Sequence, residues 1–359
     1  MSNGLEGVIA AETVLSDVDG AAGRLVIRGR LVGDLAKTAS FAEVAHLLLD
    51  GFFDDLPPPA ALERALGRSR VEVFAEVATL DATLLALAPT EAARALIARL
   101  GDGDDLDAAL RLMAAPAVFT PAILRARRGA APIAPDDSAG HAHDVLHMMN
   151  GAPASAAEAA ALEAYLVTVC DHGLNASTFA ARIVASTGAG LTSAALAGFS
   201  ALKGPLHGGA PGPVIEMLDA IGEVDNAQPW LEAALARGDR LMGFGHRIYR
   251  VRDPRADALK RAASTLGPAS GRLAYAEAVE RAALDILKRR KPERSLQTNV
   301  EFYTALLLEA LAFPPEAFTC VFAMGRMAGW VAHAREQAQS GRLIRPQSRY
   351  VGPTPMRAA

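Results

Sequence analysis

The chain has 359 residues, a length that can bury a sizeable core and that favours two domains, or one large and one small lobe. Its 36 Lys and Arg nearly balance its 40 Asp and Glu, for a formal net charge of −4, which argues against a nucleic-acid-binding surface as the main function. No apolar run reaches the ~18 residues needed to cross a bilayer, and the N-terminus shows no secretion signal, so we expect a cytoplasmic protein with no membrane partner. The two cysteines, Cys170 and Cys320, have no metal-ligand spacing and fit a reducing compartment.

Strand signals are confined to the N-terminus, and most of the remaining sequence is typical of helices. Residues 23–29 form a short segment that contains β-branched residues and is bounded by glycines, which predicts a small hairpin within residues 12–30. Frequent alanine and only 5% aromatic residues favour helix between glycine and proline breaks. In chain order, helices are expected at residues 41–49, 59–67, 71–88, 90–100, 105–115, about 121–129, 155–170, 174–201, 302–311 and 317–339, with a further helical block from about 212 to 304.

The character of the sequence changes near residues 207–212 and changes back near 305, with the more charged stretches in between. We therefore expect a large helical domain made of residues 1–207 and 307–359 and a smaller one made of residues 208–306. The junction of two such lobes is a usual place for a ligand site.

Several residues that carry useful chemistry stand beside glycine or proline, where the backbone can turn sharply or approach a ligand. His207 lies in Gly204-Pro-Leu-His-Gly-Gly, and His246 lies in Gly243-Phe-Gly-His-Arg. Arginine binds carboxylates in a bidentate fork, histidine polarises a carbonyl, and a carboxylate in an apolar segment can deprotonate a weak carbon acid. Such a set suits a small dianionic or trianionic substrate. Its members are His172, His207, His246, Arg255, Arg326, Arg345 and Glu301.

Each of these residues also has a purely structural interpretation when it is taken alone. Arg326 could form a buried ion pair, Arg345 could belong to a solvated tail, and Glu301 could support a helix start. His333 is expected to pack inside a helix. His141, His143 and His147 cluster around Asp144, but a loop and a helix entry explain them more simply than a metal site does, so we expect no bound metal.

Five ordered motifs make the chain resemble the citrate synthases along nearly its whole length. The resemblance implies a mainly helical citrate synthase-like fold, with a large and a small helical domain and a minor N-terminal hairpin. The motifs are Gly4 to Val8 with Thr13 to Asp17 and Arg28-Gly29, Asp171 to Thr178, Gly204 to Ala210, Gly243 to Tyr249 with Asp253-Pro254-Arg255, and Ala323 to Trp330 with Arg345-Pro346 and Tyr350.

The resemblance implies an acyltransferase that converts the acyl group into an alkyl group on transfer, in the tricarboxylic acid cycle. Acetyl-CoA and oxaloacetate would give citrate and CoA through an enolate, an addition and thioester hydrolysis. His207 would hydrogen-bond the thioester carbonyl, Glu301 would take the methyl proton, and His246 would polarise the keto oxygen of oxaloacetate. No metal or redox cofactor is implied, because the CoA thioester is itself a substrate.

The same resemblance implies the groups that hold the substrates. Oxaloacetate would be bound by His172, Arg255 and Arg326, together with Arg345, which matches an arginine that reaches in from the partner subunit. A homodimer is therefore expected. CoA phosphates would lie near Arg250 and Arg294.

Three positions depart from the family pattern. Glu301 stands where aspartate is usual, and the extra methylene can displace a base by about 1 Å, which costs on the order of 100-fold in rate unless it is compensated. Pro211 replaces a common asparagine, and Gly173 replaces a common acidic residue. Two alternatives stay open: a 2-methylcitrate synthase that uses propionyl-CoA, and a catalytically silent paralogue that binds CoA or citrate.

Overall fold

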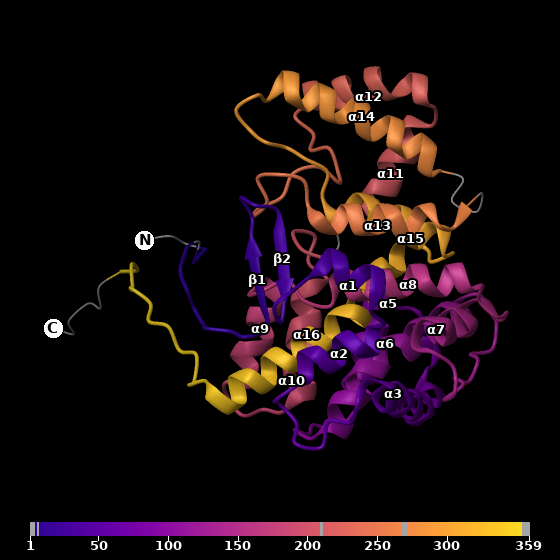
Figure 1. Cartoon of the computed structure of the whole chain (residues 1–359), viewed down its shortest axis with the longest axis vertical. Helices are drawn as coiled ribbons and strands as arrows, with labels where there is room; N and C mark the ends of the chain where they lie inside the picture. The colour runs from indigo at the N-terminus through magenta and orange to yellow at the C-terminus, as the bar shows by residue number, and fades with distance from the viewer. Residues whose placement is uncertain (1–3, 6, 209–210, 268–271, 354–359) are drawn as a thin grey trace.

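The structure is a computed structural model that describes residues 4–5, 7–208, 211–267 and 272–353. It is mainly helical, as expected, with one small antiparallel sheet near the N-terminus (Figure 1). Strands β1 (Ser16–Asp19) and β2 (Arg24–Ile27) form the predicted hairpin, with Ser16 opposite Ile27. A third short strand, β3 (Arg30–Leu31), follows a tight turn in which Arg28 and Gly29 have φ of 47° and 81°. Positive φ at both turn residues matches the twist of a two-residue hairpin.

Most helices gather in one large group around the buried core (Figure 1). Their starts follow local signals: Ser40 and Ser155 form capping boxes at the helices that begin at Phe41 and Ala156, and Asp105 caps the helix that begins at Leu106. The group consists of α1 (Val32–Thr38), α2 (Phe41–Leu49), α3 (Pro59–Phe74), α4 (Ala82–Leu85), α5 (Pro89–Ile97), α6 (Leu106–Arg127), α7 (His141–Asn150), α8 (Ala156–Val169), α9 (Ala176–Ala185), α10 (Leu191–Leu202) and α16 (Phe318–Ser340), with short 3₁₀ helices at Ala75–Thr79 and Pro315–Ala317.

Helix α6 corrects two sequence-based expectations. A break was expected at Pro116, yet α6 runs through both Pro116 and Pro121 because it lies in the core, where packing outweighs the local cost of proline. Thr120 Oγ1 donates to the carbonyl of Pro116 at 2.6 Å. By length and hydropathy α6 could also cross a membrane, which the sequence analysis did not anticipate, but 89% of that window is buried inside the protein.

Two other helix boundaries differ from expectation for identifiable reasons. Helix α3 continues past residue 67 because Arg70 is buried and pairs with Asp144, with Nε 2.6 Å from Oδ2. The helix expected at residues 174–201 is divided into α9 and α10, because Gly188 and Gly190 adopt φ of 76° and 88°. Such positive φ is readily reached only by glycine and ends a helix.

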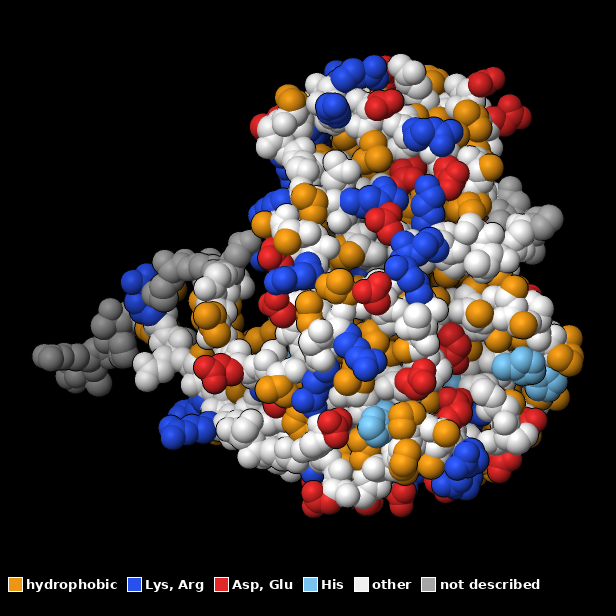
Figure 2. Space-filling model, viewed as in Figure 1, with side chains coloured by type: hydrophobic (Ala, Val, Ile, Leu, Met, Phe, Trp, Pro, Cys, Tyr) orange, Lys and Arg blue, Asp and Glu red, His pale blue; other side chains and the backbone are white. Residues whose placement is uncertain are grey.

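A second group of helices lies at one end of the molecule (Figure 1). It contains α11 (Gly212–Ile221), α12 (Val224–Ala236), α13 (Pro254–Ser264), α14 (Leu273–Arg290) and α15 (Val300–Ala310). The division into residues 1–207 with 307–359 and residues 208–306 stays a prediction, and its second boundary falls inside α15. Figure 2 shows acidic and basic side chains interspersed over one face of the molecule, in keeping with the nearly balanced charge.

Helices α8 and α16 approach each other closely next to the junction of the two groups. A Cβ added to Gly325 would come within 2.7 Å of the carbonyl oxygen of Leu166, and one added to Gly329 would overlap the carbonyl oxygen of Cys170. Both glycines are therefore required for this approach. Arg326 lies between them in the sequence, and its Nε donates to the carbonyl of Val169 at 2.6 Å.

Candidate active site

Six of the seven predicted site residues meet where loops and helix ends of the two groups converge. The large group supplies the loop between α8 and α9, the segment after α10 and the middle of α16, while the second group supplies a loop and the starts of α13 and α15. The rings of His172 and His246 lie edge to face, 5.7 Å apart. The six residues are His172, His207, His246, Arg255, Glu301 and Arg326.

The loop that carries His246 is tied to the start of α15. The backbone N–H of Gly245 donates to the carbonyl of Gln297 at 2.7 Å, and Asn299 Nδ2 donates to the carbonyl of Gly245 at 2.8 Å. Gly243 and Gly245 both have φ of 83°, which explains why the loop requires glycine there. These contacts place His246 beside the helix that begins with Val300 and Glu301.

The surroundings of His246 determine where its proton lies. Its Nδ1 accepts hydrogen bonds from the backbone N–H groups of Ile248 and Tyr249, at 3.0 and 3.1 Å. A neutral imidazole carries one proton, so that proton is on Nε2. Arg255 Nη2 lies 3.3 Å from Nε2, and because both atoms carry hydrogen this contact is not a hydrogen bond. Two donors therefore face one space, which suits a substrate oxygen.

The second glycine-flanked histidine, His207, is held by a contact with Ser177. Its Nε2 lies 2.8 Å from Ser177 Oγ, which also lies 2.8 Å from Asn175 Oδ1 and accepts from Trp330 Nε1 at 3.2 Å. A hydroxyl has one proton to give, so Ser177 sets which nitrogen of His207 is protonated. When Ser177 donates to Asn175 Oδ1, the Nε2–H of His207 donates to Ser177 and Nδ1 can only accept. When Ser177 donates to Nε2 instead, the ring proton is on Nδ1 and can be donated to a ligand.

Both histidines are neutral at physiological pH. Burial, followed by the charges of Arg326 and Arg255, lowers the pKa of His207 to about 4. Burial, followed by the charge of Arg255, lowers the pKa of His246 to about 4. Neutral imidazoles of this kind can donate a hydrogen bond to a carbonyl without becoming charged.

These shifts predict how stability depends on pH. An exposed histidine titrates near 6.5, so between about pH 6.5 and 4 the unfolded chain binds protons that the native chain does not, and stability falls as pH falls. The expected loss at pH 5 is on the order of 1–2 kcal/mol per histidine. Urea unfolding at pH 7 and pH 5 measures it, with His207→Gln as the matched variant. Equal losses in the variant and the parent protein would contradict the assignment.

Two buried arginines supply the positive charge of the site. Arg255 is paired, since Asp253 accepts from its Nη2 at 2.8 Å and from its Nε at 3.0 Å. Arg326 donates through Nε to the carbonyl of Val169, and no hydrogen bond from its terminal nitrogens is recorded among the described residues. Burial lowers the pKa of Arg326 to about 10, so it stays charged at neutral pH. Its free donor pair suits a substrate carboxylate.

Glu301 lies in the first turn of α15, and its backbone N–H donates to the N-cap residue Asn299 at 3.2 Å. Part of its side chain is accessible, but Oε2 is buried with no hydrogen-bond partner among the described atoms. Burial raises the pKa of the carboxyl group, and the charge of Arg255 opposes this. A buried carboxylate without a partner is poised to accept a proton.

Three polar side chains of the site were missed as individual site residues. Ser177 and Tyr249 lie inside the motifs, and Tyr249 Oη is 3.2 Å from His172 Nε2. Tyr165 had no sequence signal, because a tyrosine in an apolar helix is typical of a core. Its hydroxyl is buried without a recorded partner, and the charges of Arg326 and Glu301 both act on it.

Three predicted binding residues lie apart from the assembled site. Arg345 is exposed on the extended segment after α16, which leaves the body of the molecule (Figure 1). Arg250 and Arg294 are also exposed, and the backbone N–H of Arg250 donates to the carbonyl of Gly20 in the hairpin turn at 2.8 Å. Gly209 and Ala210, from the motif around His207, lie outside the described residues.

The histidine cluster near Asp144 has structural contacts. His141 is buried, stacks on Phe41 with ring centroids 5.1 Å apart, and has Nδ1 3.2 Å from Arg70 Nη1. In the part of the chain that the structure describes, no group of three or more His, Cys, Asp or Glu side chains is arranged to hold a metal.

Comparisons with known proteins agree with the resemblance found in the sequence. A family model described as "Citrate synthase, C-terminal domain" matches residues 4–347. A protein of Mycobacterium tuberculosis named "Putative citrate synthase 2" is 39% identical over 98% of this chain and 93% of its own length. A "Citrate synthase" of Haloferax volcanii is 37% identical over 98% and 96%, and a "2-methylcitrate synthase" of M. tuberculosis is 36% identical over 98% and 91%.

Solved structures give the same result for the fold. The crystal structure of citrate synthase from Thermotoga maritima superposes with a TM-score of 0.86 at 32% identity, covering 100% of this chain and 98% of that one. Citrate synthase from Thermoplasma acidophilum, in a ternary complex with carboxymethyl coenzyme A and oxaloacetate, has a TM-score of 0.85 at 28% identity, with the same coverage.

Proposed function

Because the chain belongs to the citrate synthase family, we propose that it condenses acetyl-CoA with oxaloacetate to give citrate and CoA. One observation carries this proposal: His246 Nε2 and Arg255 Nη2 face the same space from 3.3 Å apart, in a site that also holds a buried carboxylate and a free guanidinium donor pair. A keto dicarboxylate offers the matching acceptors.

The proposed reaction begins at the methyl group of acetyl-CoA. Glu301 removes a methyl proton, and the enolate oxygen that forms accepts a hydrogen bond from neutral His207. The enolate carbon then attacks the keto carbon of oxaloacetate, whose oxygen is polarised by a hydrogen bond from the Nε2–H of His246. The new alkoxide gains one proton, which balances the proton that Glu301 took from the methyl group. Water finally hydrolyses the thioester of citryl-CoA, releasing citrate and CoA.

In this proposal oxaloacetate is held by His172, Arg255 and Arg326. The CoA phosphates are bound by Arg250 and Arg294, which lie on the surface outside the assembled site. The CoA thioester is a substrate, so the proposed reaction uses no metal or redox cofactor. We also propose that the enzyme works in the cytoplasm on small molecules alone, without a nucleic-acid or membrane partner.

Steady-state release of CoA thiol tests the proposed function. Acetyl-CoA and propionyl-CoA are each supplied with oxaloacetate, and the expected result is a higher kcat/KM for acetyl-CoA. The reverse preference would identify a 2-methylcitrate synthase. Gly173 and Pro211 depart from the common residues close to two of the site histidines, and they leave the acyl-CoA preference open. One methylene in an apolar pocket is worth only about 1–3 kcal/mol, so both rates must be measured. If neither acetyl-CoA nor propionyl-CoA gives any release of CoA thiol, the protein is a silent paralogue and the proposal is contradicted.

A homodimer with Arg345 acting across the subunit boundary is part of the proposal. Arg345→Ala and Glu301→Gln are each expected to be nearly inactive alone. A mixed dimer of the two has one site that combines an intact Glu301 with an intact Arg345 from the other subunit. Co-expression of the two variants is therefore expected to restore about half the activity per mixed dimer.

Two measurements accompany this experiment. Light scattering of the unmodified protein is expected to give at least the mass of a dimer, and Arg345→Ala is expected to leave that mass unchanged. A fully active monomer, or mixed dimers no more active than their parents, would show that Arg345 does not act in the partner's site.

A further inference from the structure

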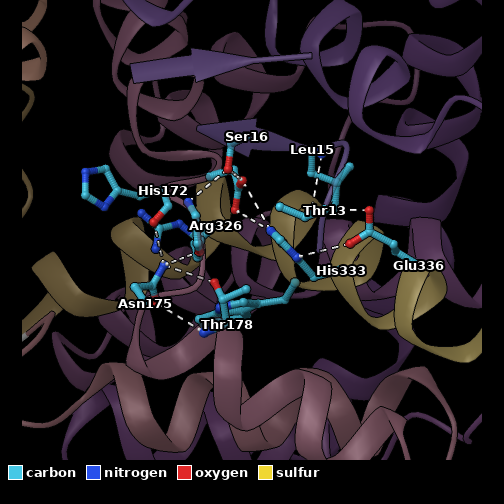
Figure 3. Close-up of polar contacts among 12 residues, drawn as sticks. Thr13, Leu15, Ser16, His172, Asn175, Thr178, Arg326, His333 and Glu336 are labelled. Atoms are coloured by element: carbon cyan, nitrogen blue, oxygen red, sulfur yellow. Dashed lines mark hydrogen bonds and ion pairs between the residues drawn. The ribbon is translucent and has the colours of Figure 1, made fainter. Parts of the chain in front are cut away.

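A buried polar network joins the first strand to the last helix directly behind His172 (Figure 3). At its centre is Asp171, which is fully buried and immediately precedes His172 in the sequence. Ser16 Oγ donates to Asp171 Oδ2, and His333 Nε2 lies 3.3 Å from the same oxygen. These contacts span 155 and 162 residues of sequence, so the His172 loop is held by the first strand, β1, and by helix α16 near the C-terminal end.

Ser16 forms hydrogen bonds to the loop on both sides of His172. While its hydroxyl donates to Asp171, its oxygen accepts the backbone N–H of Gly173 at 2.9 Å. Gly173 has φ of 57°, a conformation that most side chains disfavour. One serine side chain thus fixes the residue before His172 and the residue after it.

The other side of the network fixes the tautomer of His333. Arg182 Nη1 lies 3.0 Å from His333 Nδ1, and arginine can only donate, so Nδ1 accepts and the ring proton is on Nε2. That proton is directed at Asp171. Asp171 therefore receives two donors on one oxygen, one from β1 and one from α16.

The network also contributes to the electrostatics of the site, because Asp171 acts on the charge of Arg326. Arg326 lies two helical turns before His333 on α16, on the same face. Asp171 is the negative group that acts most strongly on its buried guanidinium. A shift of Asp171 would therefore disturb His172 through the backbone and Arg326 through its charge.

We propose that Ser16, Asp171 and His333 are positioning residues for oxaloacetate binding, with Ser16 of the N-terminal hairpin holding the His172 loop in its binding geometry. The inference rests on the proposed function, because it assigns oxaloacetate as the ligand of His172 and Arg326. It adds the N-terminal strand to the substrate-binding machinery.

Ser16 offers the cleanest test because it is half-buried at the edge of the sheet, so its replacement leaves the core intact. Ser16→Ala removes both hydrogen bonds, and Ser16→Thr keeps a hydroxyl in the same place. Thr13→Val is the matched control: Thr13 Oγ1 donates to Glu336 at 3.2 Å and anchors the same segment, but it does not touch the His172 loop.

The dissociation constants of oxaloacetate and of CoA are measured by calorimetry for all four proteins. Ser16→Ala is expected to weaken oxaloacetate binding about tenfold, because without these hydrogen bonds the His172 loop spends only part of its time in the binding geometry, and to leave CoA binding nearly unchanged. Ser16→Thr is expected to restore the affinity, and Thr13→Val to retain it.

A second comparison distinguishes the positioning of His172 by Ser16 from a general increase in mobility of the protein. If Ser16 acts through His172, Ser16→Ala weakens oxaloacetate binding much less in a His172→Gln background than in the parent protein. The inference is overturned if Ser16→Ala binds oxaloacetate as tightly as the parent, or if Thr13→Val loses as much affinity as Ser16→Ala. Failure of the parent protein itself to bind oxaloacetate would instead overturn the proposed function.

Discussion

Glu301→Gln is expected to lower turnover by at least ~100-fold while oxaloacetate affinity changes by less than about twofold. Glutamine keeps the size of glutamate and its place in the first turn of α15, but its amide cannot accept the methyl proton of acetyl-CoA. Among the residues that the structure describes, Oε2 of Glu301 has no hydrogen-bond partner to lose, so the substitution breaks no hydrogen bond at that atom. Single-turnover rates and calorimetric titration with oxaloacetate measure the two quantities.

Glu301→Asp is the informative companion variant. If the backbone around Asn299 and Val300 is adjusted to the longer side chain, shortening it withdraws the carboxylate by about 1 Å and lowers the rate, by up to on the order of 100-fold. If the pocket still suits an aspartate, the same variant becomes faster. A Glu301→Gln enzyme with near-normal turnover would place the base elsewhere in the site.

Arg326→Leu is expected to weaken oxaloacetate binding by at least ~100-fold, because a buried carboxylate of the substrate loses a charge-assisted, two-pronged partner. Its pKa of about 10 keeps the side chain charged at neutral pH, so the lost interaction is ionic throughout the usual assay range. Calorimetric titration with oxaloacetate is the direct measurement.

Arg326→Lys is the control, since it keeps the charge but not the planar fork. We expect the oxaloacetate affinity of Arg326→Lys to lie between that of the parent protein and that of Arg326→Leu. Thermal unfolding and CoA affinity are measured for both variants. They distinguish a specific loss of oxaloacetate binding from destabilisation of the whole protein. Unchanged oxaloacetate affinity in Arg326→Leu would assign Arg326 to a structural role beside Val169 and Phe322, whose ring lies 5.0 Å from its guanidinium carbon.

Helix positions were predictable where local signals and tertiary packing agree. The N-terminal hairpin is bounded by glycines, and α2 and α8 begin at serine caps, so local signals agree with the packing there. Helix α6 was not predictable, because its two prolines carry a local penalty that only burial on all sides overcomes. A single sequence contains no measure of that burial.

The candidate site shows the same limit. Histidines and arginines beside glycine or proline were visible as candidates, and six of the seven come together in space. The hydroxyl of Tyr165 was not visible, because a tyrosine in an apolar helix resembles an ordinary core residue. The pairing of Asp171 with His333 was not visible, because the two residues lie 162 positions apart in the sequence and only the fold brings them together.

The close approach of α8 and α16 also bears on how the protein tolerates mutation. At Gly325 and Gly329 an added methyl group meets backbone atoms of Leu166 and Cys170, which cannot rotate away as a side chain does. Even alanine would push the two helices apart, and Arg326, which lies between the glycines, would move with α16. A survey of all single variants ranked by activity is therefore expected to place these two glycines beside Glu301, although neither one carries a chemical group that the reaction uses.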